Sequence, residues 1–550
     1  MTHSDLSKRC RAAGILLRTL AGFFSAVVVH AVGLAAALPA PPQTFDTGYA
    51  APAGATLTVA AGGDLQAALN KAQLGDTIVL QAGATFSGAF KLPNKTTGSG
   101  WIYVVSSNLA SLPPPGQRVG PKDGMNMPKI VERASTSALG TVPNSHHYRF
   151  VGIEFTAEPG ARVYQLISIG NSDASPATLA HHIVFDRCYV HGDPTADNRR
   201  GIEMDGAYVA VVDSYISDFQ ERGADSQGLW AYNTTGPLRI VDDYIEAAGE
   251  NVMFGGKDSS TAALVPADIE IRNNYFFKPL SLIGSSFTVK NLLELKAAQR
   301  VLVTGNTFQN SPAGAQGGTA VVITPRNQDG HAPWSVTADI AVTGNSLINV
   351  GNGFGMLGRD NGYPSQLLTR LLIRDNVVGV TGLNYANGVA FQVIHGGSDI
   401  TIDHNTVINT VGPPHTAYPT SALYMADGSE KLTNFTFTNN LATNSARGIC
   451  GSGQKQGTAV INAYFTNWVV SKNVITGAPA DAYPAGNFFP ATMDAVRFTS
   501  YANGNYTLSA DSPYKSAATD GTDIGANLSV VPGVVPGVVL PNAPSKVDVK

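Results

Sequence analysis

Three charged residues near the middle of the chain could together perform acid–base chemistry. Glu294 and Lys296 lie in the segment NLLELK, and Arg326 follows in AVVITPRN. A lysine whose pKa is lowered by neighbouring positive charge can act as a base, and the planar guanidinium of an arginine binds carboxylates. This set suits β-elimination on a uronic acid, with Lys296 as the base, Arg326 as the carboxylate clamp and Glu294 orienting Lys296. The alternative is an ion-pair network that only holds neighbouring segments in register.

Paired carboxylates offer a second kind of chemistry. Glu203 and Asp205 lie in GIEMDG, and Glu250 lies in GENVMFGG. A glycoside hydrolase needs two carboxyl groups, about 5–5.5 Å apart for retention or about 6.5–9.5 Å apart for inversion. The same three residues are candidate metal ligands for Ca²⁺, which takes roughly six to eight oxygen atoms, although no repeated Asp–Gly loop accompanies them. Beyond this Ca²⁺ candidate, the sequence indicates no cofactor.

Further polar and aromatic residues flank the same short apolar segments, which makes them candidates for binding a substrate. Trp230 is expected to be an exposed aromatic side chain. The complete set is Trp230, Asn251, Asn327, Arg359, Asp360 and His395. By contrast, the adjacent histidines His146–His147 and His181–His182 would point to opposite faces of a strand, so neither pair is expected to bind a metal.

A repeated pattern determines where these residues lie. Alternating apolar residues are followed by two polar positions, a slot that is most often asparagine, any residue and an apolar residue. A second short strand lies between the copies, and no long helical pattern separates them, so each copy predicts one coil of a β-solenoid of about eleven coils. A sandwich or a propeller fits the pattern less well. The slot residues are Cys188, Ser214, Asp243, Asn274, Asn306, Asn345, Asn376, Asn405, Asn440 and Asn473.

The solenoid gives a structural role to the slots and the cysteines. Identical amides on successive coils lie about 4.8 Å apart and can hydrogen bond to each other, so we interpret the slots as a structural ladder. Cys188 and Cys450 lie too many coils apart for a disulfide, and both are expected to be buried thiols. Because side chains alternate along a strand, Leu293 and Leu295 of NLLELK should point inward while Glu294 and Lys296 point outward.

The beginning of the chain and its composition bound the class of protein. Residues 1–37 have the basic start, apolar run and small residues of a secretory signal peptide, and an uncleaved signal anchor is the alternative. We therefore expect a monomer that is secreted to the periplasm or the exterior, with no membrane span in the mature chain. The formal net charge of −4 and the 14% of charged residues do not suggest a nucleic-acid-binding surface.

The rest of the chain divides into three parts. Residues 50–100 are expected to form an N-terminal cap and the first coil, with Asp64 capping a short helix that precedes the first strand, TIVL. Residues 101–510 would form the β-helix. Residues 511–550 would form a C-terminal segment that ends in a Pro/Val-rich tail.

The helix followed by GDTIVLQAG, together with the Asn-slotted coils, resembles the pectate lyase-like superfamily of right-handed parallel β-helices. The chain is similar in particular to bacterial exported β-helix proteins with segments such as DSQGLW, EAAGENVMFGG, NLLELKAAQRVLVTGNTF and TPRNQDGHAPW. The resemblance implies an all-β fold with a carbohydrate groove along one outer face. The superfamily includes polysaccharide lyases, glycoside hydrolases, uronan epimerases and non-catalytic adhesins.

The resemblance and the central charges together give a functional expectation. We expect an extracellular polysaccharide as the partner and a lyase acting on a uronate-containing chain as the function. The alternatives are a glycoside hydrolase and a non-catalytic carbohydrate-binding or cell-surface protein. The negative net charge of the chain fits an acidic substrate only if the groove is locally basic.

Overall fold

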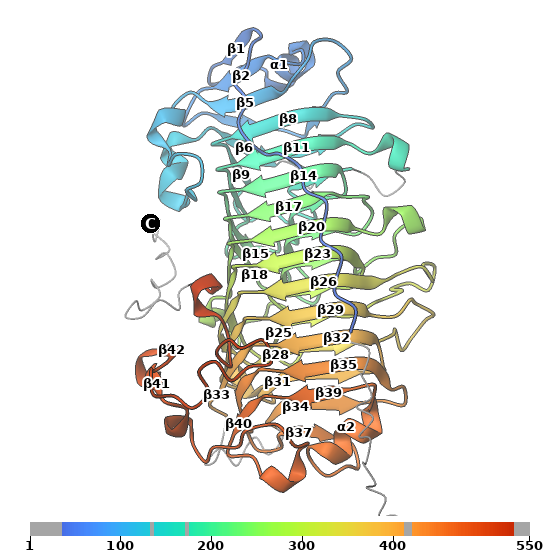
Figure 1. Cartoon of the computed structure of the whole chain (residues 1–550). Helices are drawn as coiled ribbons and strands as arrows, with labels where there is room; N and C mark the ends of the chain where they lie inside the picture. Colours follow the sequence, from blue (N-terminus) through green and yellow to red (C-terminus); the bar gives the residue numbers. More distant parts are fainter. Residues whose placement is uncertain (1–35, 133–136, 171–174, 412–420, 533–550) are drawn as a thin grey trace, which may run out of the picture. The chain divides into compact units, whose positions relative to one another are not determined.

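Short strands that recur along the chain stack into three long parallel sheets (Figure 1). The structure is a computed structural model that describes residues 36–132, 137–170, 175–411 and 421–532. Each coil passes from a strand of sheet I to one of sheet II and then to one of sheet III, and strands of successive coils pair in parallel. This is the all-β parallel β-helix that the repeat predicts.

The three sheets differ in their number of strands. Sheet I has 15 strands: β1 (Thr56–Val59), β2 (Thr77–Leu80), β5 (Ile102–Ser106), β8 (His146–Val151), β11 (His181–Asp186), β14 (Ala207–Val212), β17 (Leu238–Val241), β20 (Ala267–Arg272), β23 (Ala298–Thr304), β26 (Thr337–Thr343), β29 (Thr369–Arg374), β32 (Ser398–Asp403), β35 (Leu432–Thr438), β38 (Phe465–Thr466) and β39 (Val469–Ser471). Sheet II has 13: β3 (Thr85–Ser87), β6 (Lys129–Glu132), β9 (Glu154–Ala157), β12 (Tyr189–His191), β15 (Tyr215–Phe219), β18 (Tyr244–Ala247), β21 (Tyr275–Phe277), β24 (Thr307–Ser311), β27 (Ser346–Val350), β30 (Val377–Val380), β33 (Thr406–Asn409), β36 (Leu441–Thr443) and β40 (Val474–Thr476). Sheet III has 12: β4 (Phe90–Leu92), β7 (Leu139–Thr141), β10 (Ile167–Ile169), β13 (Arg200–Met204), β16 (Gln227–Ala231), β19 (Glu250–Phe254), β22 (Leu293–Leu295), β25 (Thr319–Ile323), β28 (Asn352–Leu357), β31 (Val389–Ile394), β34 (Ala422–Asp427) and β37 (Ile449–Gly451).

Inward side chains of the three sheets form one continuous apolar core. The strand register places like residues above one another, as in the row Val209, Leu238, Ile269 and Val301 of sheet I. All four side chains are buried. Because each coil covers its neighbours, apolar burial runs along the whole stack and fixes which residues face outward.

The turn between sheets I and II carries the predicted ladder. In Asn345, Nδ2 donates to Oδ1 of Asn376 at 2.9 Å, and Nδ2 of Asn376 donates to Oδ1 of Asn405 at 2.9 Å. Each Oδ1 also accepts the backbone N–H of the preceding slot residue, and these side chains are fully buried. The residue before most slots, such as Asp375 with φ 55°, is in the left-handed region, which makes the turn tight. The structural interpretation of the slots is confirmed.

The two ends correct two details of the sequence analysis. Helix α1 (Leu65–Lys71) begins after Asp64, whose carboxylate accepts the N–H of Ala67, as predicted. The segment TIVL is strand β2, and β1 precedes the helix as the first strand. The sheets also contain more strands than eleven coils would give, because the coils before the first slot lack the pattern. Near the other end, α2 (Thr458–Tyr464) packs on β37, and β41 (Phe498–Ser500) pairs with β42 (Asn505–Leu508).

Residues 37–50 run across the coils on the outer face of sheet I (the dark blue segment of Figure 1). Their position is fixed by hydrogen bonds from backbone N–H groups to aspartates that recur at one place in the coil. Two of these aspartates are paired with arginines of the next coil, Arg300 and Arg370. The acceptors are Asp399, Asp339 and Asp268, at 3.2, 3.0 and 2.9 Å.

We expect the substitution Asp339→Asn to loosen this segment. Asp339 accepts the N–H of Ala40 and two bonds from Arg370, and the hydrogen bonds from Arg370 lower its pKa. D339N should lower the unfolding free energy by about 1 kcal/mol. Asp339 stabilises the fold above the pKa of an aspartate in the unfolded chain, and this stabilisation disappears as the pH falls through the lowered pKa of the folded protein. Thermal unfolding and the rate of proteolytic cleavage within residues 37–50 measure it. Equal behaviour of D339N and the exposed control Asp494→Asn would contradict the role of this contact.

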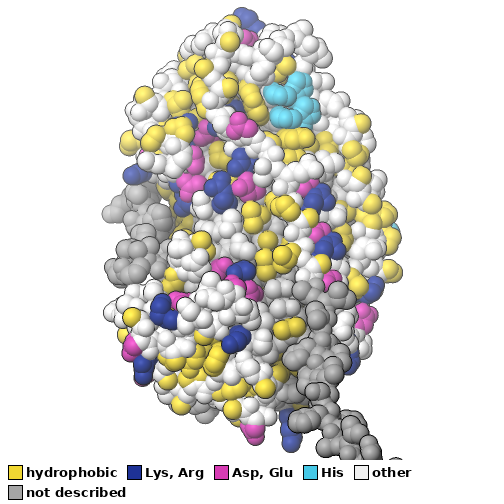
Figure 2. Space-filling view, in the orientation of Figure 1, with side chains coloured by type: hydrophobic (Ala, Val, Ile, Leu, Met, Phe, Trp, Pro, Cys, Tyr) yellow, Lys and Arg dark blue, Asp and Glu magenta, His cyan; other side chains and the backbone are white. Residues whose placement is uncertain are grey.

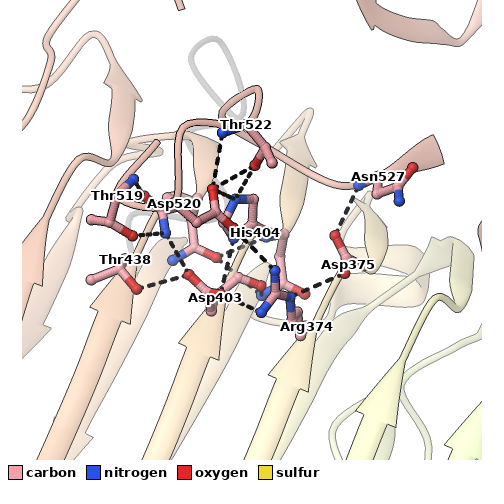
Figure 3. Close-up of polar contacts among 12 residues, drawn as sticks. Arg374, Asp375, Asp403, His404, Thr438, Thr519, Asp520, Thr522 and Asn527 are labelled. Carbon is pink, nitrogen blue, oxygen red and sulfur yellow. Dashed lines mark hydrogen bonds and ion pairs between the residues drawn. The ribbon is translucent and has the colours of Figure 1, made fainter. Parts of the chain in front are cut away.

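The described part of the C-terminal segment folds back over the turns between sheets I and II (Figure 3). The left-handed turn residues present their side chains to it: His404 Nε2 lies 3.1 Å from Oγ1 of Thr522, and Asp375 accepts the N–H of Asn527 at 2.9 Å. The same residues that make the turns tight therefore also bind this segment. The Pro/Val-rich tail lies outside the described residues.

Two other expectations concern export and the cysteines. The predicted signal peptide lies almost wholly outside the described residues, and within the described part of the chain no helix is long and apolar enough to cross a membrane.

Cys188 and Cys450 are free and buried, as predicted. Burial raises the pKa of the Cys188 thiol to about 12, so this thiol is not a nucleophile at neutral pH.

Candidate functional site

The outer face of sheet III carries most of the predicted site residues. Pairing of β13, β16, β19, β22 and β25 places Glu203, Trp230, Met253, Glu294 and Val322 in one row across five coils. Their strand neighbours, including the leucines of NLLELK, belong to the apolar core. The alternation expected from the sequence therefore holds in this sheet.

A groove of about 470 Å³ lies at the end of this row, where the strands of three successive coils finish. Glu294 and Lys296 come from β22 and the residue that follows it. Arg326 and Asn327 follow β25, and Asp360 follows β28. The structure thus brings five of the sequence-predicted residues to one groove. Its lining residues are Glu294, Lys296, Gln316, Val322, Thr324, Arg326, Asn327, Gln328, Asp360, Gly362 and Tyr363.

Lys296 and Glu294 form an ion pair inside the groove. Nζ of Lys296 lies 3.4 Å from Oε1 of Glu294, and Glu294 is only 2% exposed. Burial raises the pKa of Glu294 to about 7, with a further contribution from the neighbouring carboxylate of Glu250 and against the lowering effect of Lys296. The Glu294 carboxyl can therefore change its protonation state near neutral pH.

Arg326 is held beside Lys296 by the coil itself. Its backbone N–H donates to the carbonyl oxygen of Lys296 at 2.8 Å. Its Nη1 atom pairs with Oδ1 of Asp360 at 3.0 Å and donates to Asn361 at 2.6 Å. Both contacts use Nη1, which leaves the Nε–Nη2 edge of the guanidinium for a ligand carboxylate. Asp360 in turn accepts the N–H of Asn327 at 2.8 Å, so the whole turn is tied together.

A chain of polar side chains behind Glu294 was not predicted from the sequence. Glu250 pairs with Lys290 at 2.8 Å and accepts from Gln227 at 2.8 Å, and Gln227 accepts from Arg200 at 2.9 Å. Burial alone would raise the pKa of Glu250, but the ammonium groups of Lys290 and Lys296 lower it to about 2. Glu250 is thus a permanent anion next to Glu294. In the sequence, only the recurrence of polar residues at the ends of strands pointed to these side chains.

A fully buried lysine supports the start of β19. Four acceptors share the three N–H groups of the Lys278 ammonium: the carbonyl oxygens of Ala247, Ala248 and Gly249 and Oδ1 of Asn251. Burial lowers the pKa of Lys278 to about 7, although Glu250 and Glu246 act in the opposite direction. Lys278 thus holds together the turn that leads from sheet II to the strand bearing Glu250, a role that was not predicted from the sequence.

Two of the predicted substrate-binding residues are buried, so the expected exposure of Trp230 is wrong. Trp230 is only 3% exposed: its ring lies between the guanidinium of Arg200, at 3.8 Å, and the ring of Tyr232, at 4.7 Å. Asn251 is fully buried and holds Lys278. Strand alternation does not predict these contacts, which for Asn251 involve backbone carbonyl oxygens of sheet II and the turn at Lys278. Neither residue is part of the site that we propose.

Arg359 and His395 lie farther along the edge that carries the groove, but neither lines it. Arg359 follows β28 and pairs with Glu430 at 3.5 Å. His395 follows β31 in the next coil and is half-buried. These two residues could contact a chain longer than the groove, and this remains a prediction.

The three carboxylates considered for Ca²⁺ do not fit that ion. Asp205 is fully buried, and its Oδ1 accepts the N–H groups of Tyr232 and Asn233. Glu250 is engaged by Lys290 and Gln227, and Glu203 accepts from Ser168. A cation that requires roughly six to eight oxygen ligands would have to displace these partners. We therefore derive no catalytic step through Ca²⁺ and no paired-carboxylate mechanism from Glu203 and Asp205.

Comparison with solved structures identifies the fold. A PL6 family alginate lyase, AlyGC, superposes with a TM-score of 0.50 at 14% sequence identity, over 88% of this chain and 59% of that chain. This chain is a right-handed parallel β-helix. The resemblance inferred from the sequence is therefore confirmed for the fold. This β-helix spans less than two thirds of the length of AlyGC.

Other solved β-helices are similar at lower scores. The catalytic unit of a GH87 α-1,3-glucanase from Streptomyces thermodiastaticus strain HF3-3 gives a TM-score of 0.48 at 13% identity, over 83% of this chain and 72% of that chain. The pectate lyase Pel9A gives 0.38 at 13% identity, over 86% and 96%. No protein-family model and no curated protein matches this β-helix.

Proposed function

We propose that this β-helix is a secreted lyase that cleaves a uronate-containing polysaccharide by β-elimination. The observation that carries the proposal is that Glu294, Lys296 and Arg326 line one groove on the outer face of sheet III. A candidate base and a carboxylate-binding cation there belong to adjacent coils, so one sugar unit can touch both. The groove is open to a polymer along the stack.

The proposed reaction uses the groove residues in distinct roles. Arg326 binds the uronate carboxylate and stabilises the negative charge that develops on it. The amine of Lys296 takes the proton from the carbon next to that carboxylate. The electron pair of this C–H bond forms a double bond to the neighbouring carbon, while the glycosidic C–O bond on that neighbour breaks. The departing oxygen takes a proton from water, and Lys296 returns its own proton to water.

Local charge favours an acidic substrate despite the negative net charge of the chain. Lys296 and Arg326 face the groove, where Asp360 pairs with Arg326, and Lys290 lies behind it. Glu250 is already neutralised by Lys290, and Glu294 is protonated in part near neutral pH. The polymer of first choice is alginate, because the AlyGC structure is that of an alginate lyase.

The direct test is incubation of the purified protein with alginate, polygalacturonate and glycosaminoglycans. A lyase produces unsaturated ends that absorb ultraviolet light. New reducing ends without this absorbance would show that the protein is a hydrolase and contradict the proposal. Retention on a polysaccharide affinity gel with neither signal would replace it with a non-catalytic carbohydrate-binding protein.

We expect the rate to rise as the pH passes through about 7, the pKa of Glu294. Above this pH the carboxylate accepts an N–H of the neutral Lys296 amine and orients its lone pair, whereas the protonated acid does so less well. Glu294→Gln should remove this rise and lower the rate above neutral pH, while Glu158→Gln, after β9, keeps the wild-type profile. Initial rates from pH 5 to 9 measure the effect. An unchanged profile in E294Q would remove Glu294 from the mechanism.

A further inference from the structure

Four histidines gather on the outer face of sheet I, away from the groove on sheet III. They are His146 and His147 at the start of β8 and His181 and His182 at the start of β11. Figure 2 shows the histidine side chains as one cyan patch on the surface of the upper coils. All four are half-buried, so the patch is accessible from solvent.

The backbone explains why neighbouring histidines meet, against the expectation that each pair points to opposite faces. His147 and His182 have φ values of 57° and 53°, in the left-handed region, so the alternation of a strand is broken between the two members of each pair. His181 is in register with His146, so the pairs stack directly. The rings of His146 and His181 lie 5.0 Å apart, and those of His147 and His182 lie 4.5 Å apart.

The ring nitrogens face each other. Nδ1 of His146 lies 2.7 Å from Nδ1 of His147, and Nδ1 of His181 lies 2.8 Å from Nδ1 of His182. In the first pair the carbonyl oxygen of Lys95 lies 2.9 Å from Nε2 of His146, so that nitrogen carries the proton. Nδ1 of a neutral His146 is then the acceptor and Nδ1–H of His147 the donor. Each pair therefore shares one proton between two nitrogens.

We propose that this histidine cluster binds a divalent transition-metal ion of the Zn²⁺ and Cu²⁺ class. Ligand nitrogens of His147, His181 and His182 lie within 4.8 Å of one another. Imidazole is a preferred ligand of these ions, and zinc–nitrogen bonds of about 2.0–2.1 Å place tetrahedral ligands about 3.3 Å apart. Small rotations of the imidazole rings would bring the nitrogens from within 4.8 Å to this ligand spacing. Where the ion takes a protonated Nδ1, that proton moves to Nε2 of the same ring, so the rings stay neutral.

The surroundings favour metal binding by neutral rings. Burial and the neighbouring histidines lower the pKa values of His147 and His182 to about 4. These rings are therefore neutral at neutral pH and need not release a charge-bearing proton before they bind a cation. Trp101 lies edge-on to His147 at 5.2 Å, and Tyr208 stacks on His182 at 4.3 Å. These aromatic rings hold the imidazoles in place, as supporting groups do around metal ligands.

Aromatic stacking alone does not account for the cluster. Tyr208, whose ring has no nitrogen, continues the stack beyond His182 in the next coil, so a stack of rings requires no histidine. His146 and His181 stack with each other in a second column, where their nitrogens meet those of the first. The arrangement supplies nitrogen ligands from two adjacent coils at one point.

The test uses protein without an affinity tag, stripped of metal and titrated with ZnCl₂ by calorimetry and with CoCl₂ by visible absorption. We expect one ion per chain and a Co²⁺ spectrum typical of nitrogen ligands. His182→Phe, which keeps a ring in the stack, should weaken Zn²⁺ binding by at least about tenfold. Tyr208→Phe in the same stack and His331→Phe at an exposed site should bind as the wild type does.

Two outcomes would overturn the metal site. One is that the wild-type protein binds no Zn²⁺ or Co²⁺. The other is that H182F and H331F bind equally well. If H182F does not fold by circular dichroism, His147→Phe serves as the second ligand variant. Because the readout is binding, the test does not depend on the proposed lyase activity on the opposite sheet.

Discussion

Replacement of Lys296 by methionine should reduce polysaccharide cleavage by about 10²- to 10⁴-fold, the contribution of a well-placed general base. Methionine keeps the unbranched apolar stem of lysine and removes only the ammonium group. The remaining polar partner is Glu294, which can be protonated near neutral pH, so no obligatory buried charge is left unpaired. The loss should therefore appear in kcat with little change in the thermal midpoint.

The measurement is the initial rate of formation of unsaturated ends with saturating substrate, beside thermal unfolding of the same preparation. Lys431→Met provides the matched control, because Lys431 is exposed and lies outside the groove. Activity retained in K296M together with a lower thermal midpoint would mean that Lys296 only holds the coils together. In that case the groove would need another base, or another function.

Strand alternation and coil stacking explain why part of the site could be predicted. Apolar residues of NLLELK must face the core, so Glu294 and Lys296 must face outward. In the next coil, Val321 and Ile323 pair with Leu293 and Leu295, and Arg326 follows this strand as Lys296 follows the one before it. Side chains at equivalent positions of a parallel solenoid become neighbours whatever the loop length between them. For this reason three residues from two repeats could be proposed for one edge, although the register between the coils came only from the structure.

What alternation cannot predict is whether an outward side chain is also exposed. Trp230 and Glu294 occupy the same row of sheet III, and both are buried; the ring of Trp230 is covered by Arg200 and Tyr232. The long-range contacts of Asn251 and Lys278 likewise depend on a turn between two sheets. Periodicity carries no information on such turns, so the polar chain behind the groove could be found only in the structure.

The strand pattern also failed to predict local backbone conformation. A strand pattern implies opposite directions for adjacent side chains, but a left-handed residue reverses one of them, as at His147 and His182. The same conformation recurs at this place of later coils, for example at Asp268 and Asp339, where it presents carboxylates to residues 37–50. Non-glycine residues adopt it only when the surrounding coils impose it, and so single-sequence patterns give little warning of it.

Replacement of Lys278 by methionine should be the most destabilising change at a site remote from the groove. The lysine is 0% exposed, and three carbonyl oxygens and the amide oxygen of Asn251 share the three N–H groups of its ammonium. A buried acceptor that loses its donor costs about 1–3 kcal/mol, so the total should be about 3 kcal/mol or more of unfolding free energy. Methionine fills the volume but donates nothing.

The effect should be measured at about pH 6, below the lowered pKa of Lys278, so that the wild-type side chain carries its full set of donors. Urea and thermal midpoints of K278M would be compared with those of Lys455→Met, which changes the same residue type at an exposed position. Because the turn held by Lys278 leads into the strand that bears Glu250, the variant should also disturb the anion beside Glu294. Unfolding midpoints equal to those of K455M would show that the carbonyl oxygens find other donors, and that this buried cation contributes nothing to the stability of the coil.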